Sequence, residues 1–243
     1  MIEAYLVAFN EEETFHLSIK HYQDFCDQVI ILNNHSTDRT AEIAKDMGCK
    51  VRNFGTPGVL SDRDYVDIKN NCWKREGRDN RDWVIVCDCD EILWVNENIR
   101  QRLLRVRFEE KTIIKTSGWN VFSHDMPKDY WLEITNGHYE QNYSKTVIFD
   151  PKQITDINFR IGCHVSSPKG NVVWSDEVLT LFHYRNVGGP QRLVERHNMY
   201  RPRMSQENLE RKWGIHYLWE DQVRVKEWEE KFQKSKPFLQ AGS

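Results

Sequence analysis

An apolar run that stops abruptly at acidic residues is the feature that most constrains this chain. Trp83–Cys87 is typical of a short buried strand, and Asp88, Asp90 and Glu91 follow it directly. Open α/β sheets form their ligand crevices at the carboxyl ends of such strands. Carboxylates at i and i+2 project from the same side of an extended chain, so Asp88 and Asp90 can reach one divalent cation. Solvated acids at a strand end give the same pattern, so the interpretation depends on the surrounding sequence.

The first half of the chain alternates strand and helix patterns with short connections. Strands are expected at Ile2–Phe9, Val29–Leu32, Lys50–Asn53 and Trp83–Asp88, and helices after Asn10, from Ser36 to Gly48 and over Asp64–Arg75. Alternating βα units predict a parallel sheet that is covered by helices on both faces, with right-handed crossovers.

From Thr112 onward the pattern changes. Strands are expected at Thr112–Trp119, Lys145–Phe149, Asn171–Trp174 and Val178–Tyr184 without regular helices between them. This order predicts a mixed, partly antiparallel extension of the sheet. Pro190–Arg203 and Gln206–Lys234 are expected to be closing helices, the second highly charged and amphipathic, with docking to a membrane surface or a partner protein as the alternative.

Composition narrows the class of protein. The 243 residues suffice for one α/β domain. A formal net charge of −3 gives no overall positive electrostatic field, which argues against a general nucleic-acid-binding protein. Six cysteines are scattered without a metal-finger spacing, so Cys163 and His164 with Cys87 and Cys89 do not form one of the usual zinc sets. With no apolar start and no apolar stretch of membrane-spanning length, a cytoplasmic protein with reduced thiols is expected.

Three motifs in a fixed order carry a resemblance to a known family. Val7–Glu12, Ile30–Thr40 and Asp88–Glu91 together resemble family 2 glycosyltransferases with the GT-A fold, over roughly residues 1–95. The resemblance implies a Rossmann-like α/β fold with a mixed, mainly parallel central sheet flanked by helices. Residues 1–187 would form the GT-A domain, and 188–243 a helical extension packed on the same domain.

The resemblance also implies a nucleotide-sugar donor and places residues around it. Base and ribose contacts fall on the motif residues Phe9, Asn10, Glu11, Asn33 and Asn34, while Asp88 and Asp90 serve ribose and metal. The family usually has an aspartate where this chain has the two asparagines, and an amide can donate as well as accept. A uridine diphosphate donor is the default expectation, with guanosine, thymidine and cytidine donors open.

A histidine is expected as a further metal ligand. Several GT-A groups place one at the end of a late strand, and His183 has that position here, with His164 as its rival. Imidazole and carboxylates suit Mn²⁺ as well as Mg²⁺. Lys145 and Arg185 are expected to contact the departing diphosphate, and the helix bearing Lys69, Asn70 and Asn71 to contact the donor.

The resemblance implies inversion at the anomeric carbon, which needs a carboxylate to take the acceptor's proton. In the family this carboxylate often belongs to a Glu-Asp pair well after the metal motif, and this chain has no clear Glu-Asp pair there. Three acids remain as candidates: Glu140, which is preferred because it precedes a strand placed beside the crevice, Asp125 and Asp176.

Two other functions are compatible with parts of the sequence. A sugar-nucleotide pyrophosphorylase or nucleotidyltransferase shares the α/β base, but it should carry a glycine-rich basic loop where this chain has Asn10–Glu13. A non-catalytic nucleotide-sugar-binding module is the second. The acceptor stays open among a glycan, a lipid-linked sugar, a protein and a modified nucleic acid.

Overall fold

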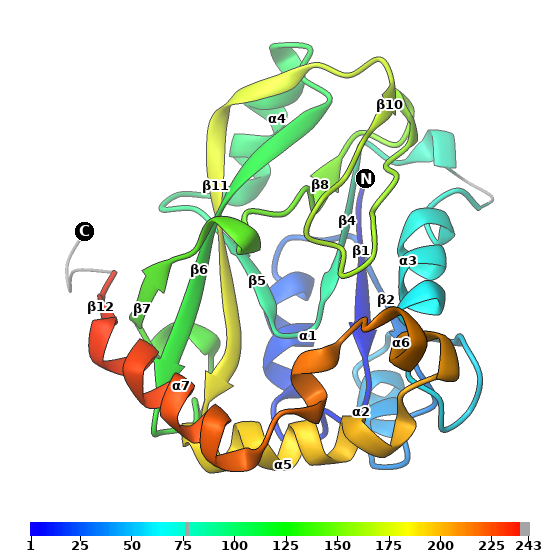
Figure 1. The fold of residues 1–243 in the computed structure, drawn as a ribbon. Coiled ribbons are helices and arrows are strands. Elements are labelled where there is room, and N and C mark those ends of the chain that lie inside the picture. The colour runs from blue at the N-terminus through cyan, green and yellow to red at the C-terminus, as the bar shows by residue number, and fades with distance from the viewer. Residues whose placement is uncertain (76–77, 239–243) are drawn as a thin grey trace.

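The computed structural model describes residues 1–75 and 78–238 (Figure 1). Its first half contains β1 (Ile2–Ala8), α1 (Phe15–Gln23), β2 (Gln28–Asn33), α2 (Thr40–Asp46), β3 (Lys50–Asn53), α3 (Asp62–Asn71), β4 (Trp83–Asp88), β5 (Glu91–Trp94) and α4 (Ile99–Phe108). Its second half contains β6 (Ile113–Ser123), β7 (Asn136–Tyr139), β8 (Ile148–Phe149), β9 (Ile154–Asp156), β10 (Lys169–Gly170), β11 (Trp174–Val187), α5 (Gly189–Tyr200), α6 (Gln206–Arg211), α7 (Asp221–Lys234) and β12 (Lys236–Pro237). Short 3₁₀ turns include η3 (Gln141–Tyr143) and η5 (Ile215–Leu218).

A single large sheet organises the molecule, in the order β12-β7-β6-β8-β4-β1-β2-β3. The strands β3, β2, β1 and β4 pair in parallel, whereas β8 pairs antiparallel with both β4 and β6. Strand β11 runs parallel to β6 and antiparallel to β5. The predicted α/β class with a mixed central sheet is therefore confirmed.

Apolar side chains cover both faces of the central strands. In β1, Ala4 and Leu6 belong to one buried cluster, while Tyr5 and Val7 belong to a second. Because successive side chains of a strand point to opposite faces, these two clusters lie on opposite sides of the sheet. Helix α1 contributes to the first cluster, whereas Trp73, just after α3, contributes to the second. Because both faces of such a strand are buried, nearly all of its residues are apolar, and this continuous apolar run is the pattern from which the strand was predicted.

Several predicted elements differ in the structure. The single helix expected over Gln206–Lys234 was wrong: it is divided into α6, η5 and α7, because Lys212 and Gly214 adopt left-handed backbone angles (φ of 59° and 62°) that end a helix. The separate strand expected at Asn171–Trp174 does not form. Strand β11 begins at Trp174 and continues through the predicted Val178–Tyr184.

Strand register brings the acidic turn against the end of β11. His183 pairs with Glu91 across the β5–β11 ladder, and the Tyr184 N–H donates to the Asp90 carbonyl at 2.8 Å. After β11 the chain turns into α5, which runs along the lower edge of Figure 1 and packs against α7. No helix in residues 1–75 and 78–238 is long and apolar enough to cross a membrane.

Candidate active site

A cavity of about 460 Å³ lies at the carboxyl ends of the central strands. This volume falls in the range of about 300–1,000 Å³ that is usual for ligand pockets. Its lining combines the ends of β1, β4 and β11 with α3, α5, η5 and the segment after η3. The cavity therefore occupies the position that the acidic strand end of the sequence predicted.

A buried charge network surrounds the first aspartate of the motif. The Asp88 carboxylate lies 2.7 Å from Lys69 Nζ and 3.7 Å from Lys145 Nζ, and Lys145 also pairs with Glu91. Burial would raise the pKa of Asp88, but Lys69 and Lys145 together hold that pKa well below its usual range. Asp88 is thus fixed as an anion between two cations, and Lys69 and Lys145 lie in the cavity as predicted.

The second aspartate faces a histidine. His183 Nε2 lies 3.7 Å from Asp90 Oδ1, too far for a hydrogen bond. The His183 ring stacks on Tyr143 at 4.4 Å between centroids, and its Nδ1 has no hydrogen-bond partner in the described chain. Burial lowers the pKa of His183, which favours the neutral imidazole that binds metals.

This arrangement fits a divalent cation. Two ligands of one Mg²⁺ or Mn²⁺, with bonds of about 2.1 Å each, lie at most about 4.2 Å apart, and the Asp90–His183 separation satisfies that limit. No cluster of three or more His, Cys, Asp or Glu side chains suited to a metal occurs among residues 1–75 and 78–238. Asp90 and His183 are thus the two side chains that could hold such an ion.

His164 also lines the cavity, but its surroundings differ from those of His183. It is exposed, its Nδ1 lies 2.8 Å from the Asn142 carbonyl, and its ring meets Tyr143 edge-on at 5.7 Å. No contact between His164 and either aspartate of the motif is seen in the described chain. Both histidines thus flank Tyr143, and His183 is the one that faces Asp90.

The end of β1 contributes Phe9 and Glu11 to the cavity. Glu11 accepts two hydrogen bonds from the Arg196 guanidinium at 2.5 and 2.6 Å, a bidentate pair between the β1 end and α5. Asn10 lies beside them with a left-handed φ of 51°, and its Oδ1 accepts from the Thr37 N–H at 2.8 Å. Asn10 therefore connects the first two motifs of the sequence, but it is not among the residues that line the cavity.

The two asparagines after β2 are buried rather than open to the cavity. Asn33 donates to Asn53 Oδ1 at 2.8 Å, and its own Oδ1 accepts from the Ser36 N–H. Asn34 accepts from Arg203 Nη2 at 2.6 Å, and the guanidinium of Arg203 lies 3.2 Å from the centre of the Phe9 ring. Arg203 thus occupies the space between Asn34 and the face of Phe9, where the sequence predicted a base.

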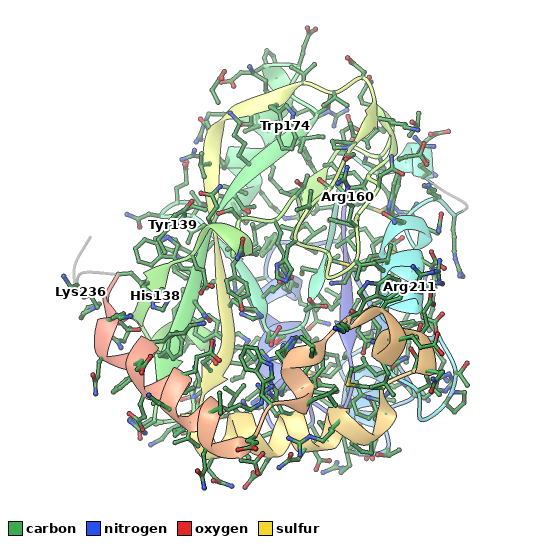
Figure 2. The ribbon with its side chains drawn as sticks, viewed as in Figure 1. His138, Tyr139, Arg160, Trp174, Arg211 and Lys236 are labelled. Carbon is green, nitrogen blue, oxygen red and sulfur yellow. The ribbon has the colours of Figure 1, made fainter. Side chains whose placement is uncertain are left out.

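Other predicted site residues do not line the cavity. Asn71 follows Lys69 by two residues, which turns it about 200° round the helix onto an exposed face. Glu140 accepts from Asn120 Nδ2 at 3.1 Å and lies 3.6 Å from His138, which Figure 2 shows next to α7.

The two other candidate bases are also elsewhere. Asp125 is exposed in the turn after β6, and its backbone N–H donates to Ser123 Oγ at 2.9 Å. Asp176 pairs with Lys111 at 2.8 Å, and the Asp176 side chain is 85% exposed. Glu140, Asp125 and Asp176 stay predictions that the cavity does not support.

Sequence reasoning missed most of the cavity wall supplied by distant segments. Asp62, at the start of α3, lines the cavity without a basic partner in the described chain, and burial raises its pKa. Arg196 and Tyr200 come from α5, and His216 and Tyr217 come from η5. No local pattern identifies these residues, because the contacts that place them join opposite ends of the chain.

Comparisons with known proteins agree with the motif-based interpretation. No protein-family model matches the chain. It is 30% identical over 92 residues to an uncharacterized glycosyltransferase of Rickettsia typhi, a stretch covering 38% of this chain and 28% of the relative. The predicted resemblance to glycosyltransferases is confirmed by this match.

Two solved structures are also similar. Residues 1–349 of S. aureus TarS align over 82% of this chain and 64% of TarS, with 14% identity and a TM-score of 0.48. Glucosyl-3-phosphoglycerate synthase from Mycobacterium tuberculosis, in complex with Mn²⁺, uridine diphosphate and glucosyl-3-phosphoglycerate, aligns over 49% of this chain and 44% of the synthase, with 21% identity and a TM-score of 0.32. The chain spans less than two thirds of each of these relatives.

Proposed function

We propose that this protein is a metal-dependent glycosyltransferase that moves a sugar from a nucleoside-diphosphate donor, by default a uridine diphosphate sugar, to an acceptor hydroxyl. The observation that carries the proposal is the meeting of Asp90 and His183 at the edge of a cavity that also holds Lys69 and Lys145. Such a set suits a substrate whose diphosphate must be bound and then released. The similarity to a named glycosyltransferase supports the same reaction class.

Asp90 and His183 would hold the Mn²⁺ or Mg²⁺ ion. The cation supplies charge neutralisation to the departing diphosphate. Asp88, held by Lys69 and Lys145, is an acceptor fixed in place for a ribose hydroxyl, as the resemblance implied. The two lysines keep the local charge balanced, so that a diphosphate entering the cavity is not repelled by Asp88 and Glu91.

Inversion requires a proton acceptor on the side of the sugar opposite the diphosphate. Glu140, Asp125 and Asp176 are the acids proposed from the sequence. Asp62 joins them as a cavity carboxylate that is not engaged by an arginine or lysine and whose pKa is raised by burial, which brings a base closer to its working pH. Asp62 is held by Asn208, whose Nδ2 donates to its Oδ1 at 3.1 Å.

A ligand panel tests the proposal. Purified protein is melted with individual nucleoside diphosphate sugars, with Mn²⁺ or with chelator, since a ligand at 100 times its Kd stabilises by about 2.7 kcal/mol. We expect stabilisation by one nucleotide class that needs Mn²⁺, and slow release of the free sugar from that donor. The matched control is Asp46→Asn, an exposed acid at the end of α2, which should behave as wild type, whereas Asp90→Asn should not respond to Mn²⁺.

The same assay separates the rival functions. Formation of a nucleoside triphosphate from the sugar nucleotide and pyrophosphate would identify a pyrophosphorylase. Metal-dependent binding without sugar release, and without transfer to any acceptor, would identify a binding module. Absence of any metal-dependent nucleotide binding would refute the proposed function.

A further inference from the structure

The histidine proposed as a cation ligand lacks the contact that usually fixes such a ring. A histidine that binds a metal through one ring nitrogen almost always donates a hydrogen bond from the other, and this bond sets the orientation of the ring. His183 faces Asp90 through Nε2, whereas its buried Nδ1 has no hydrogen-bond partner within residues 1–75 and 78–238. Another contact is therefore needed to keep Nε2 directed toward the cation.

Tyr143 supplies a contact of that kind. Its ring stacks on the His183 ring with 4.4 Å between the centroids and 27° between the planes. Near-parallel stacking depends on the orientation of both rings, so rotation of the imidazole about its bond to Cβ would turn the ring out of this contact. The stacking therefore restrains the same rotation that a hydrogen bond from Nδ1 would restrain.

Tyr143 is itself fixed by β6. A Cβ atom at Gly118 would lie 2.1 Å from the Tyr143 carbonyl carbon, so only glycine permits this close approach. The Gly118 N–H also donates to Ser144 Oγ at 3.0 Å, which holds the end of η3 against the strand. His183 pairs with Asn120 of β6, two residues beyond Gly118. Because Tyr143 and His183 are both held against this one strand, the position of one ring relative to the other is determined by β6.

We propose that Tyr143 is a positioning residue of the cation site, whose ring keeps the His183 imidazole oriented with Nε2 toward Asp90 in place of the missing hydrogen bond. The inference rests on the proposed function, because it concerns the cation of that reaction. Tyr143 acts through His183 and does not itself coordinate the ion. Since the imidazole is oriented before the cation arrives, less side-chain freedom is lost on binding, which raises the affinity for the ion.

Binding of Mn²⁺ measures this role without a turnover assay. Electron paramagnetic resonance, which reports the free ion, is recorded on the protein alone and on protein saturated with uridine diphosphate. Tyr143 also lines the cavity, and the titration without nucleotide separates its support of His183 from a contact with the nucleotide. We expect Tyr143→Leu to weaken Mn²⁺ binding by about 10–100-fold, the range typical of losing a group that orients a metal ligand. Tyr143→Phe should keep most of the affinity, because the ring remains and only the hydroxyl is lost.

A double-variant cycle shows whether Tyr143 acts through His183. In the His183→Ala background, Tyr143→Leu should cause no further loss of Mn²⁺ affinity, because the ring that Tyr143 orients is already absent. Should Tyr143→Leu fail to fold, Tyr143→Met fills the space with a flexible chain instead of a ring and carries the same expectation. Thermal melting confirms that each variant is folded during the titration.

Phe122→Leu is the matched control. Phe122 is 1% exposed and stacks on His138 with 5.4 Å between the centroids, and neither residue lines the cavity. Figure 2 shows His138 on the side of the molecule next to α7. This variant therefore removes a buried aromatic–histidine contact of the same kind away from Asp90, and it should leave Mn²⁺ affinity unchanged.

Three results would overturn the inference. The first is wild-type Mn²⁺ affinity in a folded Tyr143→Leu or Tyr143→Met variant. The second is an equal loss in Tyr143→Phe, which would assign the effect to the hydroxyl. The third is a further loss when Tyr143→Leu is added to His183→Ala, which would show that Tyr143 does not act through His183. All three leave the proposed function standing as long as the wild type binds a nucleotide sugar with Mn²⁺.

The opposite outcome is also distinguishable. Mn²⁺ binding that weakens in Tyr143→Leu and is retained in Tyr143→Phe supports Tyr143 as a positioning residue, even in a protein that binds no nucleotide sugar. Such a protein would refute the proposed function and keep the cation site. Absence of Mn²⁺ binding by the wild type, both with and without uridine diphosphate, would overturn the inference and the proposed function together.

Discussion

Replacing Asp88 by asparagine should expose how strongly the site depends on its buried charges. Asp88→Asn keeps the shape but removes the carboxylate paired with Lys69, whose side chain is 4% exposed. Loss of one partner of a buried ion pair costs about 3–5 kcal/mol. The lower end applies here, because the Asp88 side chain is 32% exposed and because Lys145 still forms its ion pair with Glu91 in the variant. A loss of about 3 kcal/mol corresponds to a fall in Tm of about 6–12 °C for a domain of this size.

The pH dependence of unfolding gives a second, independent readout. In the wild type, burial would lower the pKa of Lys69, but Asp88 raises that pKa above its usual value. Lys69 therefore contributes stability that is fully present below about pH 10.4, its unfolded pKa, and is lost as the pH rises through the higher folded pKa. In Asp88→Asn, burial dominates and the folded pKa falls below the unfolded one, so stability should rise between pH 7 and 10.

Urea unfolding at several pH values measures both effects. The control is Asp156→Asn, whose pair with Lys74 is partly exposed at 2.6 Å and should contribute about 0–1 kcal/mol. The double variant Asp88→Asn with Lys69→Met should regain most of the lost stability, because it removes the unpaired charge as well. Equal stability of Asp88→Asn and wild type, or an unchanged slope with pH, would refute the reasoning.

The remaining predictions concern the cation and the base. Mn²⁺ and uridine diphosphate should bind cooperatively, and Asp90→Asn should remove this coupling; equally tight nucleotide binding in excess chelator, measured by calorimetry, would contradict it. His183→Ala should reduce metal-dependent sugar transfer far more than His164→Ala, and comparable losses would remove His183 as the preferred ligand. Loss of the base should lower the rate of sugar transfer by about two to four orders of magnitude without changing donor affinity. Measuring the transfer rates of Glu140→Gln and Asp62→Asn side by side decides between the two acids, and near-normal rates in both variants would exclude both.

The central sheet was predictable because its strands are buried on both faces. Lys50–Asn53 has the bounds expected from the sequence, and β4 ends at Asp88 as expected. Helix α4 (Ile99–Phe108) was missed, since only Leu103 and Val106 of its ten residues are buried and arginines break the apolar period. Only the apolar middle of β11 was recognised, because the first residues of the strand, around Asp176, are mostly exposed or charged.

The site was predictable only where its residues are close in sequence or end a strand. Asp88 and Asp90 follow an apolar run, so strand geometry placed them at the crevice, whereas His183 was expected from the resemblance and lies within β11 opposite Glu91. The partners that complete the cavity gave no such signal. Arg203 reaches Asn34 from the far end of the chain, and neither residue's neighbours indicate that contact.

The segment after β11 is therefore part of the site rather than an accessory to it. Its ties to the N-terminal half include those of Arg196 with Glu11, Arg203 with Asn34 and Asn208 with Asp62. The cavity needs both halves, because the N-terminal half supplies the acids that would bind the donor's ribose and metal, and the C-terminal segment supplies Arg196, Tyr200 and Tyr217 to the same lining.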